Sequence, residues 1–375
     1  MEEARASGQK ILDLTVSNPT ETGIRPDAEI VLAALASPEA MHYDPQPRGL
    51  LRARQAVCRY YREAHEVFDL DPEQLILTTS TSEAYSYVFR LLCNPGDEVL
   101  VPKPSYPLFE FLADLADVKV APYPLLYDHG WQIDFDSLYK TARDRSRAVI
   151  LVHPNNPTGS YVSAAETLAL NAFCRERGLA LIVDEVFLDY AHQFSHDGTA
   201  HRSFVTNSEA LTFTLSGISK ISALPQMKLA WVAASGPEGM VVDAGARLEI
   251  IADTFLSMNA PVQLAAPVLL DQRKHVQPIL LERLRVNLAE LDGQLAGRPS
   301  CTRLLVEGGW YAVLRVPVLG SDEDLAIRLL RETGVSVHPG HFYDFPSEGY
   351  LVLSLITDPG DFREGVARLL QVVGI

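Results

Sequence analysis

The chain has 375 residues, of which 47% are hydrophobic and 21% are charged, the composition of an ordinary globular protein. This length accommodates two domains, or one large α/β domain with a smaller partner. The formal net charge of −16 argues against a nucleic-acid partner and against an anionic membrane surface, because both recruit basic proteins.

The sequence carries no targeting or membrane signal that we can identify. The first ten residues, MEEARASGQK, lack the apolar core of a signal peptide, and no stretch approaches the roughly 18 apolar residues of a spanning helix. The cysteines form no CxxC pair and are interpreted as buried thiols of a reducing compartment: Cys58, Cys93, Cys174 and Cys301. We therefore expect a cytoplasmic protein.

The first forty or so residues are typical of short strands and turns, and helical spacing then predicts a helix over 50–65. Between about residues 74 and 235, seven short aliphatic runs follow, and helical segments over 82–93 and 163–178 separate some of them. Near-continuous apolar runs favour a parallel sheet that is buried on both faces. The runs are QLILTT, DEVLVP, VKVAPY, RAVILVHP, LALIVDEVF, ALTFTLS and KLAWVAAS.

The pattern changes after Pro261. A long helix is predicted over 276–297, then a strand over 308–318, a helix over 324–334, and strands over 335–339 and 350–355. The predicted fold is α/β: a large domain of residues 45–275 with a mostly parallel seven-stranded sheet flanked by helices, and a smaller α+β domain of residues 1–44 and 276–375. We expect the N-terminal segment to pack on the smaller domain.

Four short signals within the predicted large domain suggest chemistry. They are TSTSE, where a strand meets a helix start, the turn NNPTG, the acidic pair after the strand LALIV, and the lysine of SGISK. Taken singly, TSTSE is most simply a helix cap, NNPTG a turn and the lysine of SGISK a surface residue. The acidic pair is as consistent with a solvated loop as with a buried site.

Together with YDPQPRG and PSYPLFE, these motifs resemble the class I/II aminotransferases, which are fold type I pyridoxal-phosphate enzymes. The spacing agrees, because Asp184 follows Asn156 by 28 residues and precedes Lys220 by 36. The resemblance extends from about Asn18 to the C-terminus.

The resemblance implies a role for each matched residue toward pyridoxal 5′-phosphate. Lys220 would form the Schiff base and then move protons as a general acid and base, and Asp184 would pair with the pyridine nitrogen. Asn156 would hydrogen-bond the phenolic oxygen, and Tyr106 would stack on the ring. The phosphate would be held by the N–H groups of Ser80 and Thr81, with Ser216 or Ser219 and with Lys228.

The resemblance also implies an active homodimer, in which Tyr43 reaches the site of the partner subunit. The substrates would be an amino acid and a 2-oxo acid, and the reaction a ping-pong transfer of an amino group. Alternatives are a pyridoxal-phosphate-dependent lyase or decarboxylase on the same scaffold, and a non-catalytic cofactor-binding regulator.

The sequence departs from the family at several positions. Phe187 replaces a tyrosine, Lys228 an arginine and Ser80 a glycine, and the usual serine position before Lys220 is Gly217. Val352 stands where the family has the arginine that binds the substrate carboxylate. Candidates for the substrate-binding role are Asn18, Arg25 and Arg48, with Arg363, His338 and His341 as further possibilities.

Other sites are not predicted. His192, His196 and His201 lie in a polar stretch that favours a solvated loop over a metal site, so no metal is expected. The sequence has no GxGxxG and no GxxxxGK[ST], which argues against dinucleotide and P-loop nucleotide binding.

Overall fold

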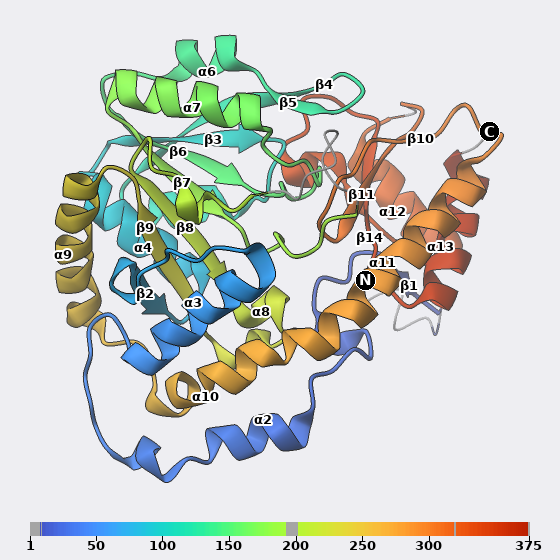
Figure 1. Cartoon of the computed structure of the whole chain (residues 1–375). Coiled ribbons are helices and arrows are strands. Elements are labelled where there is room, and N and C mark those ends of the chain that lie inside the picture. The colour runs from blue at the N-terminus through green and yellow to red at the C-terminus, as the bar shows by residue number, and fades with distance from the viewer. Residues whose placement is uncertain (1–7, 9, 193–201, 319, 374–375) are drawn as a thin grey trace.

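The computed structural model describes residues 8, 10–192, 202–318 and 320–373 (Figure 1). Its largest sheet has eight strands in the order β2-β9-β8-β7-β6-β3-β4-β5. The predicted α/β fold is confirmed, and all seven predicted strands are present. The additional strand is β5, three residues long, which forms an antiparallel hairpin with β4. The strands are β2 (Leu75–Thr78), β3 (Glu98–Lys103), β4 (Lys119–Tyr127), β5 (Trp131–Ile133), β6 (Ser146–Val152), β7 (Ala180–Asp184), β8 (Thr212–Gly217) and β9 (Ala230–Ser235).

The five central strands run in one direction. The pairs β4–β3, β3–β6, β6–β7 and β7–β8 are parallel, whereas β9 is antiparallel to both β8 and β2. The strands β6, β7 and β8 are almost wholly buried, as near-continuous apolar runs require. Because parallel strands end at one edge, the loops that follow β6, β7 and β8 meet there.

Helices cover both faces of this sheet (Figure 1). Alternate residues of β6 show the arrangement: Val149 and Leu151 share a core cluster with Phe173 of α7 (Ala164–Arg177), while Ile150 shares another with Phe89 of α4 (Thr81–Leu92). The predicted helices over 50–65, 82–93 and 163–178 are confirmed. The other helices of this part are α3 (Leu51–His65), α5 (Leu108–Asp114), α6 (Phe135–Thr141), α8 (Ile218–Ile221) and α9 (Glu238–Phe255).

A long helix, α11 (Arg273–Leu295), leads from α10 (Ala260–Asp271) to the C-terminal part of the chain (Figure 1). It begins three residues before the predicted start. The C-terminal part contains a four-stranded sheet in the order β10-β11-β14-β13, with two helices. Its elements are β10 (Thr302–Arg303), β11 (Tyr311–Arg315), α12 (Asp322–Thr333), β13 (His338–Pro339), β14 (Tyr350–Ser354) and α13 (Pro359–Val373).

The N-terminal segment contacts both parts of the molecule. β1 (Leu12–Asp13) pairs in parallel with β12 (Val335–Ser336), so this stretch packs on the C-terminal part as expected. By contrast, α2 (Ala28–Leu35) lies beside α10, and Val31 shares a core cluster with Leu269. The proposed division of the chain at residues 45 and 275 therefore stays a prediction.

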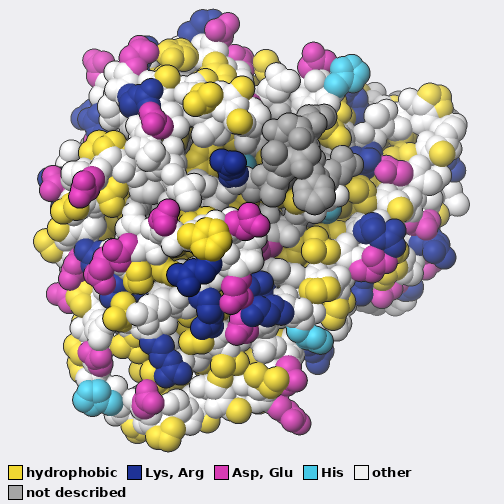
Figure 2. Space-filling model, in the orientation of Figure 1, with side chains coloured by type: hydrophobic (Ala, Val, Ile, Leu, Met, Phe, Trp, Pro, Cys, Tyr) yellow, Lys and Arg dark blue, Asp and Glu magenta, His cyan; other side chains and the backbone are white. Residues whose placement is uncertain are grey.

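The surface is charged without one dominant patch in view. Basic and acidic side chains are interspersed over the face shown in Figure 2. Within the described ranges, no helix is long and apolar enough to cross a membrane.

Candidate active site

The ends of β6, β7 and β8 bring together three residues that the sequence separates widely. Val152 pairs with Asp184, and Asp184 pairs with Leu215, so β6 and β7 end level with one another and β8 runs two residues further. The N–H of His153 donates to the Asp184 carbonyl oxygen at 2.8 Å. Asn156 follows β6, Asp184 ends β7, and Lys220 follows β8 in the one-turn helix α8. The predicted convergence at this edge is present.

The amino group of Lys220 lies among aromatic rings. Its Nζ donates to the carbonyl oxygen of Ser17 at 3.1 Å and lies 4.8 Å from the centroid of the Trp310 ring and 5.6 Å from that of Phe187. Burial lowers the pKa of Lys220 to about 8, although the negative charge of Asp184 acts in the opposite direction. A substantial neutral fraction near pH 8 suits a nucleophilic amine.

The carboxylate of Asp184 is held from two sides. Its Oδ1 accepts the Val186 N–H at 3.1 Å, and its Oδ2 accepts the hydroxyl of Tyr85 at 3.3 Å. Burial raises the pKa of Asp184 to about 6, despite these two donors. The ionised form would therefore be stabilised further by a cationic group, such as a protonated ring nitrogen.

Asn156 occupies a tight turn that is attached to the C-terminal part. Gly159 closes the turn with φ +69°, a conformation that glycine adopts without strain. Its carbonyl oxygen accepts the N–H groups of Glu307 at 3.1 Å and Gly308 at 2.9 Å. The side-chain Oδ1 of Asn156 is buried and has no hydrogen-bond partner. A buried carbonyl oxygen without a donor is costly, and it fits a ligand that donates a hydrogen bond at this position.

The start of α4 offers donors for an anion. Ser80 is the N-cap, and its hydroxyl accepts the N–H of Glu83 at 3.2 Å, so its own contribution to a phosphate would come from the backbone. Thr81 is the first residue of this twelve-residue helix. Backbone N–H groups and the helix dipole favour a phosphate at such an end.

The other predicted phosphate residues differ in their surroundings. Ser216 is fully buried in β8, with its hydroxyl 3.5 Å from the Glu185 carbonyl oxygen. Ser219, in α8, is half-buried, and Lys228 is exposed at a left-handed backbone position with φ +54°. Of the two serines, Ser219 is the more accessible to a ligand.

Tyr106 is partly exposed after β3, where the N–H of the buried Ser105 donates to the Tyr343 carbonyl oxygen at 3.0 Å. Phe187 is buried and packs edge-on against Trp310 at 5.3 Å between ring centroids. An apolar ring thus stands where the family has a tyrosine hydroxyl.

Two of the three predicted substrate residues, Asn18 and Arg48, make contacts of their own within the protein. Asn18 follows Ser17 closely, but its Oδ1 caps a short turn by accepting both the N–H and the hydroxyl of Thr20. Arg25 is exposed. Arg48 is committed elsewhere, because its Nε pairs with Glu249 at 2.8 Å and its guanidinium also donates to the Glu73 carbonyl oxygen.

Val352 is fully buried in β14, between Val313 of β11 and His338 of β13. It is part of the core, so no cation occupies the family's carboxylate position. Arg363 pairs with Glu290 at 3.2 Å on the surface, which leaves it structural.

The sequence analysis missed Tyr85, Trp310 and the carbonyl of Ser17. Tyr85 lies one turn into α4, and helical spacing from the Ser80 cap could have placed it beneath the sheet edge. The Gly308-Gly309 pair was a signal of close backbone approach before Trp310. No sequence signal marks a backbone carbonyl.

The residues present fit pyridoxal phosphate. An amine with a lowered pKa and a half-buried carboxylate with a raised pKa lie at the sheet edge with Asn156, whose buried Oδ1 has no partner. A helix N-terminus follows β2, which β9 separates from β8 in the same sheet. These are the groups needed for an aldehyde, a ring nitrogen, a phenolic oxygen and a phosphate.

A metal site finds no support among the residues that the structure describes, where no three potential ligands cluster. His192 is half-buried, and desolvation of its ring lowers its pKa to about 4. His196 and His201 lie outside the described residues.

Comparison with known proteins gives a consistent result. The sequence model of the family described as "Aminotransferase class I and II" matches residues 9–369. The glutamate-pyruvate aminotransferase AlaA of Haemophilus influenzae is 25% identical, over 97% of this chain and 91% of the relative. The alanine aminotransferase of Mycobacterium tuberculosis is 26% identical, over 97% and 86%.

Solved structures share the fold. An alanine aminotransferase from Pyrococcus furiosus superimposes with a TM-score of 0.86 at 23% identity, covering 99% of this chain and 94% of that one. An Escherichia coli aminotransferase gives 0.84 at 22% identity, covering 99% and 93%.

Proposed function

The chain belongs to the class I and II aminotransferases and is a pyridoxal-phosphate-dependent enzyme, and we propose that Lys220, Asp184 and Asn156 are the residues that operate its cofactor. It moves an amino group between an amino acid and a 2-oxo acid. The observation that carries the assignment is the convergence of these three side chains, with opposite pKa displacements of the amine and the acid, at one sheet edge.

When bound, pyridoxal phosphate supplies an aldehyde carbon for the amino groups and a ring that accepts the electron pair of the substrate Cα. Lys220 would hold the aldehyde carbon through Nζ, and as a free amine it would be the general acid and base that moves the proton of the substrate Cα. Its lowered pKa favours the neutral form that this step needs.

Asp184 would hold a proton on the ring nitrogen. The hydroxyl of Tyr85 and the N–H of Val186 orient the carboxylate and support its ionised form. Asn156 would hydrogen-bond the phenolic oxygen, and Tyr106 would cover the ring. The backbone of Ser80 and Thr81, the hydroxyl of Ser219 and the charge of Lys228 would hold the phosphate, whereas the fully buried Ser216 is the less accessible of the two serines.

The assignment of Lys220 is tested by reducing the loaded enzyme with borohydride and locating the modified residue by mass spectrometry. We expect the cofactor on Lys220, and loss of the visible absorbance in Lys220→Ala. Modification of another lysine in the wild-type enzyme would overturn the assignment.

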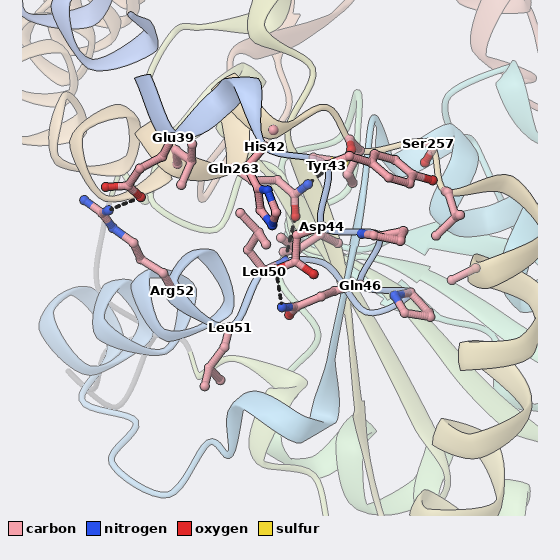
Figure 3. A pocket seen from close by; sticks show the side chains of 18 of the residues that line it. Glu39, His42, Tyr43, Asp44, Gln46, Leu50, Leu51, Arg52, Ser257 and Gln263 are labelled. Atoms are coloured by element: carbon pink, nitrogen blue, oxygen red, sulfur yellow. Dashed lines mark hydrogen bonds and ion pairs between the residues drawn. The ribbon is translucent and has the colours of Figure 1, made fainter. Parts of the chain in front are cut away.

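A symmetric homodimer is part of this proposal. Tyr43 is 77% exposed and lines a pocket of about 600 Å³ with Leu51, Leu256 and Met258 (Figure 3). Met41, next to this pocket in sequence, is 91% exposed. A largely apolar concave face of this size favours cover by a second copy, whose site Tyr43 would then enter.

Mixing two inactive variants tests the shared site. Lys220→Ala removes the amine from its own subunit, and Tyr43→Ala removes the residue offered to the partner. If Tyr43 acts across the interface, heterodimers regain one complete site, so an equal mixture should recover about a quarter of the wild-type activity. Absence of recovery, with heterodimers demonstrated by mass, would place Tyr43 outside the partner's site.

For the substrate, we propose an amino acid with an aromatic or large apolar side chain. Phe187 and Trp310 flank Lys220, and Tyr311 lies 6.4 Å from Phe187 between ring centroids. One relative, from Caenorhabditis elegans, is named tyrosine aminotransferase. A screen of twenty amino acids for loss of the visible absorbance should rank aromatic donors first, and a preference for acidic donors would contradict this substrate class.

We also propose a cytoplasmic location. All four cysteines are free thiols, which agrees with a reducing compartment.

Transfer of an amino group is favoured over the lyase and decarboxylase alternatives because the matched relatives and structures have aminotransferase names.

A further inference from the structure

The helix that carries Lys220 is too short to fix itself. α8 contains four residues and has no side-chain hydrogen bond at its N-cap. The N–H of Ala223 reaches the Lys220 carbonyl oxygen only at 3.4 Å. A single turn leaves its carbonyl groups without a following helical turn, so other groups must satisfy them.

Two side chains from distant parts of the sequence supply these bonds. The hydroxyl of the fully buried Tyr190 donates to the Lys220 carbonyl oxygen at 2.6 Å. The side-chain amide of Gln277, in α11, donates to the Ile221 carbonyl oxygen at 3.0 Å. The end of α8 is therefore capped from both directions along the chain. Tyr190 precedes Lys220 by 30 residues, and Gln277 follows Ile221 by 56.

The amide of Gln277 is itself oriented by a carboxylate. Its Nε2 donates both to Ile221 and, at 2.7 Å, to Oδ2 of Asp189. Because both partners are acceptors, only the nitrogen can occupy this position, which fixes the orientation of the amide. Loss of the carboxylate would release that constraint.

Asp189 pairs with a buried histidine. Its Oδ1 lies 2.8 Å from Nε2 of His65, and the two side chains are only 5% and 10% exposed. The hydroxyl of Tyr60 lies 3.1 Å from both carboxylate oxygens. Burial acts to lower the pKa of His65, but the hydrogen bond and charge of Asp189 outweigh burial and raise it overall. Glu185 adds to this effect and Arg273 opposes it.

We propose that Tyr190, Gln277 and Asp189 are positioning residues for Lys220: the His65–Asp189 pair orients Gln277, and Gln277 and Tyr190 hold the lysine-bearing turn against the sheet edge. This inference rests on the proposed function, in which Lys220 is the reacting amine. A proton carrier must lie within hydrogen-bond reach of the carbon it serves, and a misplacement of about 1 Å is costly to the rate.

The test measures Lys220 directly in the cofactor-free enzyme. Competitive acetylation with limiting reagent across pH, quantified by mass spectrometry for each lysine peptide, gives the pKa and reactivity of Lys220. In the wild-type enzyme we expect a pKa of about 8. In Tyr190→Phe and in Gln277→Met the turn loosens and the amine becomes better hydrated, so its pKa should rise by about half a unit or more.

Tyr123→Phe is the matched control. Tyr123 is also a buried tyrosine whose hydroxyl donates to a backbone carbonyl, that of Ile150 at 2.8 Å, but it does not contact α8. The Tyr123→Phe variant loses the same kind of hydrogen bond, and it should leave the pKa of Lys220 unchanged.

The outcomes separate this inference from the proposed function. Cofactor attached to Lys220 in the wild type, with the same Lys220 pKa in Tyr190→Phe, Gln277→Met and Tyr123→Phe, would overturn the positioning network alone. Cofactor attached to a different lysine would overturn the proposed function. A rise confined to Tyr190→Phe and Gln277→Met supports the network.

Discussion

Replacing Lys220 by methionine should stabilise the cofactor-free protein at neutral pH. The ammonium group is held where burial lowers its pKa to about 8, from an ordinary value of 10.5. A lysine with a lowered folded-state pKa destabilises the fold while it is charged. This loss in the free energy of unfolding is present in full below pH 8, and it disappears as the pH rises from 8 toward 10.5.

The size of the effect follows from the displacement. About 2.5 pH units correspond to roughly 3 kcal/mol at 1.36 kcal/mol per unit. Because Lys220 is only half-buried, solvent screening reduces this to about 1–2 kcal/mol. Methionine keeps most of the apolar stem against Trp310 and Phe187, so little packing is lost.

Urea denaturation of the cofactor-free protein at pH 6, 7, 8, 9 and 10 measures the difference. Lys220→Met should be more stable than the wild type by about 1–2 kcal/mol at pH 6 and 7, and the gain should shrink at pH 9 and 10. Lys119→Met, at an exposed lysine, is the control and should show no such trend. A gain that is independent of pH, or a loss of stability at pH 7, would refute the reasoning.

Three further substitutions test the site's supports. Tyr85→Phe removes a donor that favours ionised Asp184, so the pKa of Asp184 should rise and the dissociation constant for pyridoxal phosphate should increase about tenfold in an absorbance titration. Gly159→Ala should lower the free energy of unfolding by about 2–3 kcal/mol in urea, because φ is positive and the new methyl group would collide with the Gly308 carbonyl oxygen. Val352→Arg buries a charge in the core and should lose at least about 3 kcal/mol in the same assay, whereas tolerance of the arginine would show that the position opens to a ligand.

The order of elements and the reacting edge could be predicted from the sequence because each rests on a local pattern. The seven apolar runs became strands because strands buried on both faces need continuous apolar residues. Asn156, Asp184 and Lys220 met because parallel strands share one carboxyl edge. The three-residue β5 was missed, since it is too short to show a period.

The supports of the site could not be predicted, because they depend on contacts between distant residues. Asp189 follows the DEVF motif and could be taken for another loop carboxylate, yet it pairs with His65, which lies over a hundred residues earlier. Arg48 illustrates the reverse error. It is the cation of the motif YDPQPRG, yet it pairs with Glu249, about two hundred residues later in the chain. Spacing along the chain contains no information on either pairing.

The burial of Val352 has a consequence for how the substrate is anchored. Val352 is wholly buried and pairs with Val313 on one strand and His338 on the other, so the core has no room at this position for a longer, charged side chain. We therefore expect the substrate carboxylate to be bound by groups from another element.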